Sequence, residues 1–103
     1  MKQVTGKELE ELLQGEKTVF ADFWATWCGP CRMLAPVFET LAAKYADKAE
    51  FVKVNVDEEA EAAMKYGISS IPNVIAFKNG KVAASNLGFV PESVLEDFIT
   101  ENL

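Results

Sequence analysis

The feature that most constrains the fold is a pair of cysteines, Cys28 and Cys31, at the junction of two differently patterned segments. Segment 19–25 before the pair is almost continuously apolar, which is typical of a buried strand. After the pair, apolar residues recur at the spacing of one helix face: Leu34, Val37, Phe38, Leu41, Ala42 and Tyr45. The pattern predicts a helix over about 32–45 and places Cys28 at or just before its first turn.

A cysteine at a helix N-terminus has two physical reasons to lose its proton. The first turn presents unpaired backbone N–H groups and a partial positive charge. As a capping residue, Cys28 can also accept a hydrogen bond at its sulfur from the backbone N–H of Cys31. Lowering a thiol pKa from ~8.5 to ~7 raises the thiolate fraction at neutral pH from roughly 3% to roughly half.

The other residues of the turn suit this chemistry. Cys31 is one turn further along the same helix face, where it can attack a mixed disulfide formed at Cys28. Pro30 removes no intrahelical hydrogen bond, because first-turn N–H groups have no partner inside the helix. Gly29 lets the backbone pass close without a side chain.

Two other uses of the cysteines are a structural zinc site and a structural disulfide. A structural zinc site usually needs four Cys or His ligands, and the chain has two Cys and no His, which leaves a site shared across a dimer. A purely structural disulfide at this spacing closes too small a loop to constrain the unfolded chain. A C-x-x-C beside a strand–helix–strand pattern favours redox chemistry.

The chain around the cysteines predicts a mixed α/β fold. Thr5 and Glu8 fit a capping box, and Lys2–Val4 is a weakly signalled edge strand. Pro36 is expected to kink the second helix, the alternative being that this helix starts after Pro36. The next strand, 51–56, follows a helix, so it should run parallel to the strand at 19–25.

The second half of the chain gives a hairpin and two helices. Asp57 is expected to cap a helix over roughly 58–66. Asn79-Gly80 joins strands 73–78 and 81–87. Pro91 opens a last helix, whose predicted inward residues are Val94, Leu95, Phe98 and Ile99. The prediction is a βαβ unit joined to a ββα unit, with four to five strands flanked by about four helices.

Composition narrows the function classes. The 103 residues carry a formal net charge of −6 and no basic run, so nucleic acid and anionic membranes are unexpected partners. The N-terminus lacks the apolar core of a signal peptide, and no stretch approaches the ~18 apolar residues of a membrane span. We expect one domain over residues 1–103, a monomer, in a reducing cytoplasm.

Asp22 interrupts the apolar strand. An isolated buried carboxylate is costly, so Asp22 must be paired, hydrated or protonated. It is interpreted as a general base with a raised pKa beneath the thiols, the alternative being a carboxylate that meets solvent. Lys53, on the neighbouring strand, either tunes Asp22 or is a plain surface lysine.

Further residues can border the thiols. Trp27 adjoins them and, with Val56, Ile71 and Leu87-Gly88 at strand ends, can form an apolar rim for a protein substrate. A lone Trp, however, is more often just partly buried. The Ile71-Pro72 bond is trans by default, and the residues alone do not choose cis.

The whole chain resembles the thioredoxin family. The motifs that carry the resemblance are Trp27-Cys28-Gly29-Pro30-Cys31, Asp22-Phe23-Trp24-Ala25, Lys53, Ile71-Pro72, Asn79-Gly80 and Gly88. The resemblance implies that Cys28 attacks, Cys31 resolves and Asp22 assists as proton acceptor, with Lys53 nearby. It also implies a cis Pro72, backbone pairing of substrate with Ile71, and a groove bordered by Trp27 and Gly88.

The resemblance also implies a function and partners. These are the reduction of protein disulfides through a redox-active Cys28–Cys31 disulfide, with no bound cofactor, and electrons from NADPH through a thioredoxin reductase. Typical acceptors are ribonucleotide reductase, methionine sulfoxide reductases and peroxiredoxins. The alternatives are a disulfide oxidant or isomerase, or a binding subunit in which the thiols are incidental. Four positions depart from the commonest pattern and bear on partner preference: Ser70, Asn73, Leu87 and Phe89.

Overall fold

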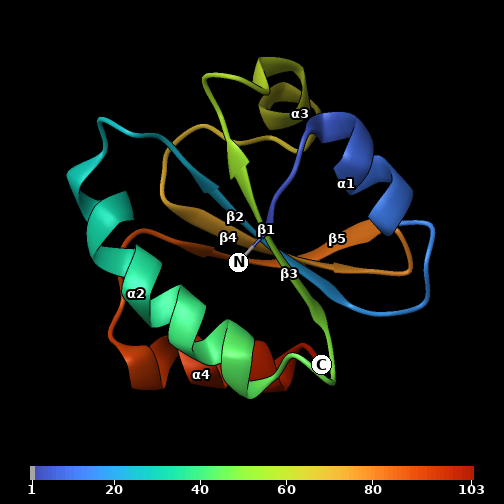
Figure 1. Cartoon of the computed structure of the whole chain (residues 1–103), viewed down its shortest axis with the longest axis vertical. Coiled ribbons are helices and arrows are strands. Elements are labelled where there is room, and N and C mark those ends of the chain that lie inside the picture. The colour runs from blue at the N-terminus through green and yellow to red at the C-terminus, as the bar shows by residue number, and fades with distance from the viewer. Residues whose placement is uncertain (1) are drawn as a thin grey trace.

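The computed structural model describes residues 2–103, which form five strands and four helices. One mixed sheet runs through the middle, with helices on both faces (Figure 1). The strand order is β1-β3-β2-β4-β5. The strands are β1 (Lys2–Gln3), β2 (Val19–Trp24), β3 (Glu50–Asn55), β4 (Asn73–Lys78) and β5 (Lys81–Leu87).

Strand directions follow the two predicted units. β1, β3 and β2 are parallel, β4 is antiparallel to β2, and β5 is antiparallel to β4. The helices are α1 (Gly6–Leu12), α2 (Gly29–Lys44), α3 (Ala60–Lys65) and α4 (Glu92–Glu101). The predicted fold, a βαβ unit joined to a ββα unit, is confirmed.

Side-chain alternation along β2 divides the core between the two sheet faces. Phe20 faces α2 and α4, where it packs with Leu34, Phe38, Leu41, Leu95 and Ile99. Val19, Ala21 and Phe23 face the other side, where Leu9 of α1 is fully buried. Since successive strand residues alternate between faces, Asp22 shares the α2 face with Phe20.

The predicted helix starts agree in part. Thr5 and Glu8 form the expected capping box on α1. The helix predicted from about Arg32 begins three residues earlier, at Gly29, because Cys28 is its capping residue. It continues through Pro36, so the alternative start after Pro36 is wrong.

The predicted hairpin is confirmed. Asn79 and Gly80 both have positive φ angles, 55° and 77°. Two consecutive positive φ angles are what a two-residue turn of this handedness needs, and the Asn-Gly pair tolerates them best.

Two predictions about helices were wrong. Asp57 does not cap α3, which begins at Ala60. Instead the Asn55 side-chain oxygen accepts hydrogen bonds from the backbone N–H groups of Asp57 and Glu58, which makes a turn before the helix. Val94 was expected inward but is 46% exposed, because α4 turns its Leu95 and Ile99 face to the sheet.

These neighbours on α4 give a direct test of the packing. Leu95→Ala should lower the free energy of unfolding by about 2–5 kcal/mol, because it opens a cavity beneath α4. Val94→Ala should change it by less than about 0.5 kcal/mol, because an exposed side chain loses little on truncation. Urea unfolding of both variants measures the difference, and equal losses would contradict this orientation of α4.

Candidate active site

The two cysteines form a disulfide at the start of α2. Cys28 is the helix cap, and its Sγ accepts a hydrogen bond of 3.2 Å from the backbone N–H of Cys31. Pro30 falls in the first turn, as expected. Both cysteines are nearly buried, with 5% and 3% of their surfaces exposed. The sulfur of Cys28 therefore lies where the helix N-terminus favours negative charge.

The loop before β4 borders the disulfide. The Sγ of Cys28 lies 3.9 Å from the carbonyl oxygen of Ile71. The Ile71–Pro72 peptide bond is cis, the form that the resemblance implied and that the residues alone left open. The backbone N–H of Gly88 donates to the carbonyl oxygen of Pro72 at 2.8 Å. This bond joins the end of β5 to the loop that borders the disulfide.

An apolar hollow of about 370 Å³ lies beside the disulfide, lined by Trp27, Val56, Ile68, Ser69, Ser70 and Ile71. Trp27 is 67% exposed, so it is part of a surface rather than of the core. Of the residues expected to form the rim, Trp27, Val56 and Ile71 line this hollow, and Leu87 and Gly88 do not.

Asp57 holds the exposed indole in place. The Nε1–H of Trp27 donates to the Asp57 carboxylate at 2.8 Å. Sequence reasoning missed this role because it assigned Asp57 to a helix cap. A usable signal existed, since Asp57 follows β3 and Trp27 follows β2, and parallel neighbouring strands end at the same edge of the sheet.

Asp22 is completely buried on the sheet face that α2 covers. Neither of its carboxylate oxygens has a hydrogen-bond partner among residues 2–103. Burial raises the pKa of the Asp22 carboxyl from 3.8 to about 6, against a smaller lowering by the charge of Lys53. The alternative of a carboxylate that meets solvent is excluded.

Lys53 is the register partner of Asp22 on β3, so both side chains lie on the same sheet face. Its Nζ lies 4.5 Å from the ring centroid of Trp24. Lys53 is half-buried rather than a plain surface lysine, and its positive charge favours the ionised form of Asp22.

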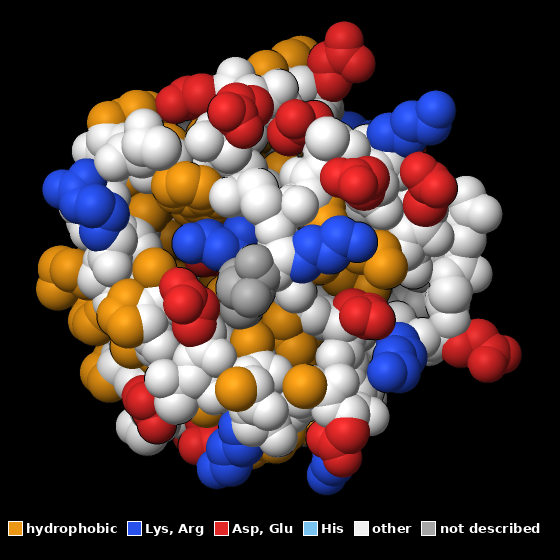
Figure 2. All heavy atoms as spheres, in the orientation of Figure 1, with side chains coloured by type: hydrophobic (Ala, Val, Ile, Leu, Met, Phe, Trp, Pro, Cys, Tyr) orange, Lys and Arg blue, Asp and Glu red, His pale blue; other side chains and the backbone are white. Residues whose placement is uncertain are grey.

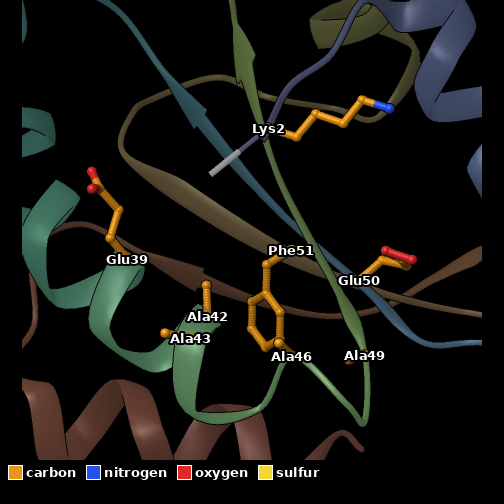
Figure 3. Close-up of a pocket in the computed structure, with 8 residues that line it drawn as sticks. All are labelled: Lys2, Glu39, Ala42, Ala43, Ala46, Ala49, Glu50 and Phe51. Carbon is orange, nitrogen blue, oxygen red and sulfur yellow. The ribbon is translucent and has the colours of Figure 1, made fainter.

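The described residues have further surface features outside this site. A hollow of about 480 Å³ lies between α2 and β3. Figure 3 shows the residues that line it: Lys2, Glu39, Glu50, Phe51 and four alanines. Acidic side chains gather over the end formed by α1 and α3 (Figure 2). Residues 2–103 hold no cluster of His, Cys, Asp and Glu suited to a metal ion. No helix in that range is long and apolar enough to cross a membrane.

Comparisons with known proteins agree on one family. The thioredoxin family model matches residues 1–101. The chain is 46% identical over 93 residues to a thioredoxin of Alicyclobacillus acidocaldarius, covering 90% of this chain and 89% of that protein. It is 47% identical over 88 residues to a thioredoxin of Bacillus subtilis, covering 85% of each. It is 48% identical over 95 residues to a chloroplastic M-type thioredoxin of Pisum sativum, covering 91% of this chain and 55% of that protein.

The burial of Asp22 predicts a pH-dependent stability difference. The folded carboxyl has a pKa of about 6 against 3.8 when exposed, so folding loses stability as the pH rises through this window. A difference of about 2 pH units is worth about 3 kcal/mol. Asp22→Asn removes the charge but leaves a buried amide, so it should stabilise the protein at pH 8 by about 2 kcal/mol.

Urea unfolding at pH 4 and pH 8 measures this effect. At pH 4 the Asp22 carboxyl is largely protonated, so most of the advantage of Asp22→Asn should disappear. Asp47→Asn, a change at an exposed loop position, is the control and should have little effect at either pH. An Asp22→Asn protein less stable than the parent at pH 8 would mean that the carboxylate is paired in solution.

Proposed function

Because the chain belongs to the thioredoxin family of thiol–disulfide oxidoreductases, we propose that Cys28 attacks protein disulfides and Cys31 resolves the product. One observation carries this assignment. Cys28 caps α2 and its sulfur accepts a hydrogen bond from the Cys31 N–H, whereas Cys31 is inside the helix. The helix N-terminus therefore stabilises a thiolate at Cys28 in the reduced protein.

The first step joins the protein to the substrate through a mixed disulfide. The Cys28 thiolate attacks one sulfur of a substrate disulfide, the substrate S–S bond breaks, and a mixed disulfide forms. The departing substrate sulfur leaves as a thiolate and takes a proton from water. The reaction is an exchange of sulfur partners, so no other oxidant or reductant is needed.

The second step releases the substrate. Cys31 gives its proton to the Asp22 carboxylate and attacks the Cys28 sulfur, and the second substrate sulfur leaves as a thiolate. Two electrons have then passed from the dithiol to the substrate. An Asp22 pKa of about 6 suits this role, because the carboxyl is mostly ionised at neutral pH yet holds a proton better than an exposed Asp. Lys53 adjusts that balance.

The substrate segment lies along the loop before β4. The Ile71 carbonyl oxygen, 3.9 Å from the Cys28 sulfur, is in position to pair with an extended backbone that delivers its cysteine. Trp27 offers an exposed apolar surface on one side, while Pro72 and Gly88 form the neighbouring wall. Gly29 and Pro30 keep the turn narrow enough for the substrate sulfur to approach.

The departures from the commonest family pattern touch this region. Asn73 is 8% exposed, and its Oδ1 has no hydrogen-bond partner among the described residues. Ser70 lines the apolar hollow, and Leu87 and Phe89 are exposed at 60% and 40%. These four positions give the surface its own partner preference and leave the sulfur chemistry unchanged.

We infer the partners and setting from family membership. Electrons come from NADPH through a thioredoxin reductase, and the acceptors are disulfides of the ribonucleotide reductase, methionine sulfoxide reductase and peroxiredoxin classes. The protein works as a monomeric single domain over residues 1–103 in the cytoplasm. The family needs no bound cofactor. An oxidant or isomerase is less favoured, since Gly29-Pro30 resembles the reducing members. A redox-independent subunit is less favoured because Cys28 and Cys31 are joined in a disulfide.

Turnover distinguishes the proposal from its alternatives. With NADPH and a thioredoxin reductase, the protein should reduce insulin disulfides continuously. The loss of NADPH absorbance measures this turnover. A redox-independent binding subunit would show no turnover. An oxidant would be reduced once and would then pass few electrons on to insulin.

Substitution of the second cysteine tests the direction of attack. Cys31→Ser keeps the size and the turn but cannot close the internal disulfide, so it should hold substrates as mixed disulfides. Cys28→Ser should capture almost none, because its remaining thiol is inside the helix. Columns of each variant, loaded with lysate and eluted with dithiothreitol, compare the yields. Equal capture by both variants would rule out a directional mechanism.

A further inference from the structure

Three register partners cross the sheet from its edge to Asp22. Gln3 on β1 pairs with Lys53 on β3, and Lys53 pairs with Asp22 on β2. Register partners lie side by side on the same sheet face. The exposed Gln3 is therefore separated from the fully buried Asp22 by one side chain, that of Lys53.

Trp24 contacts both Gln3 and Lys53 and so connects these two members of the row. It follows Asp22 by two residues on β2, so its side chain is on the same sheet face. Its Nε1–H donates to the Oε1 of Gln3 at 2.9 Å. The Nζ of Lys53 lies 4.5 Å from the centroid of the same indole. One aromatic ring thus meets an amide at its edge and an ammonium group near its face, and both contacts restrict the orientation of the indole.

We propose that Gln3 is a positioning residue for proton transfer at the thiol pair, acting through Trp24 and Lys53 on Asp22. The Gln3 amide fixes the indole of Trp24, the indole fixes the ammonium group of Lys53, and the ammonium group sets how tightly Asp22 holds its proton. The inference rests on the proposed role of Asp22 as the acceptor of the Cys31 proton.

Of the groups around Asp22, Lys53 is the one whose charge affects the Asp22 pKa. Among the described residues, β4 presents the apolar Val74 as the other register partner of Asp22. The disulfide at the start of α2 carries no charge. Lys53 is the charged side chain that lowers the Asp22 pKa, opposing the larger effect of burial.

The loss of the Gln3 hydrogen bond should weaken this charge effect. A lysine ammonium group is strongly hydrated and sits on a flexible stem, so without a fixed aromatic face it moves toward solvent. At an effective dielectric constant of about 20, moving a unit charge from about 6 to about 8 Å raises a carboxyl pKa by about 0.5. The Asp22 pKa should therefore rise when the amide acceptor is removed.

The test is an NMR titration of the Asp22 carboxyl carbon in the oxidised protein, where neither cysteine titrates. Gln3→Met removes the amide acceptor but keeps the length of the side chain, and should raise the Asp22 pKa by about 0.5. Gln14→Met is the matched control, because Gln14 is exposed outside the sheet, and it should leave the Asp22 pKa unchanged.

A double-mutant comparison shows whether the effect passes through Lys53. Lys53→Met should raise the Asp22 pKa more than Gln3→Met does. Adding Gln3→Met to Lys53→Met should then change nothing further, since the group that Gln3 positions is gone. An unchanged or lowered Asp22 pKa in Gln3→Met overturns the proposal. The proposal is also overturned if Gln3→Met raises the Asp22 pKa as much in the Lys53→Met protein as it does in the parent.

This readout is independent of the proposed function. The titration needs no substrate and no reductase, so a negative result leaves insulin reduction untouched. Conversely, a protein that fails to reduce insulin can still show the predicted dependence of Asp22 on Gln3. The Nε1–H resonance of Trp24 should move in Gln3→Met and stay in place in Gln14→Met, which verifies that the intended hydrogen bond was removed.

Discussion

The hydrogen bond from the Cys31 backbone N–H to the Cys28 sulfur is the contact on which the chemistry depends. It makes a cysteine the cap of α2, so the sulfur meets the positive end of the helix. The position of that helix is fixed by apolar packing, since Leu34 and Phe38 of α2 lie against Phe20 of β2. The reactivity of one sulfur is therefore a consequence of the core beneath it.

The same packing makes the site costly for folding stability, because it buries a carboxylate. The sheet face that receives α2 also carries Asp22, two residues after Phe20, and leaves its carboxylate without a hydrogen-bond partner among residues 2–103. An apolar residue there would pack without penalty, whereas the acid destabilises the fold at neutral pH. Such a sacrifice of stability is expected where a buried acid serves a function, as we propose for Asp22. Lys53 limits the cost without removing it.

Much of the fold could be predicted from local sequence, because its signals are local. The Asn79-Gly80 turn, the Thr5 cap and the strand-to-helix junction at Cys28 each depend on a few adjacent residues. The predictions were less complete where a side chain had two possible partners. Asp57 fits a helix cap equally well in sequence, whereas in the fold its carboxylate accepts a hydrogen bond from Trp27. The Trp24 contact with Gln3, 21 residues away in the chain, has no local signal at all.

The central claim is that Cys28, rather than Cys31, is the thiolate of the reduced protein. The most direct measurement is brief alkylation of the reduced protein with iodoacetamide across a pH series, followed by mass mapping of the modified cysteine. Cys28 should be labelled first, with a rate that reaches half its maximum well below the ~8.5 of a free thiol. Preferential labelling of Cys31, or half-maximal labelling of Cys28 near 8.5, would contradict the account.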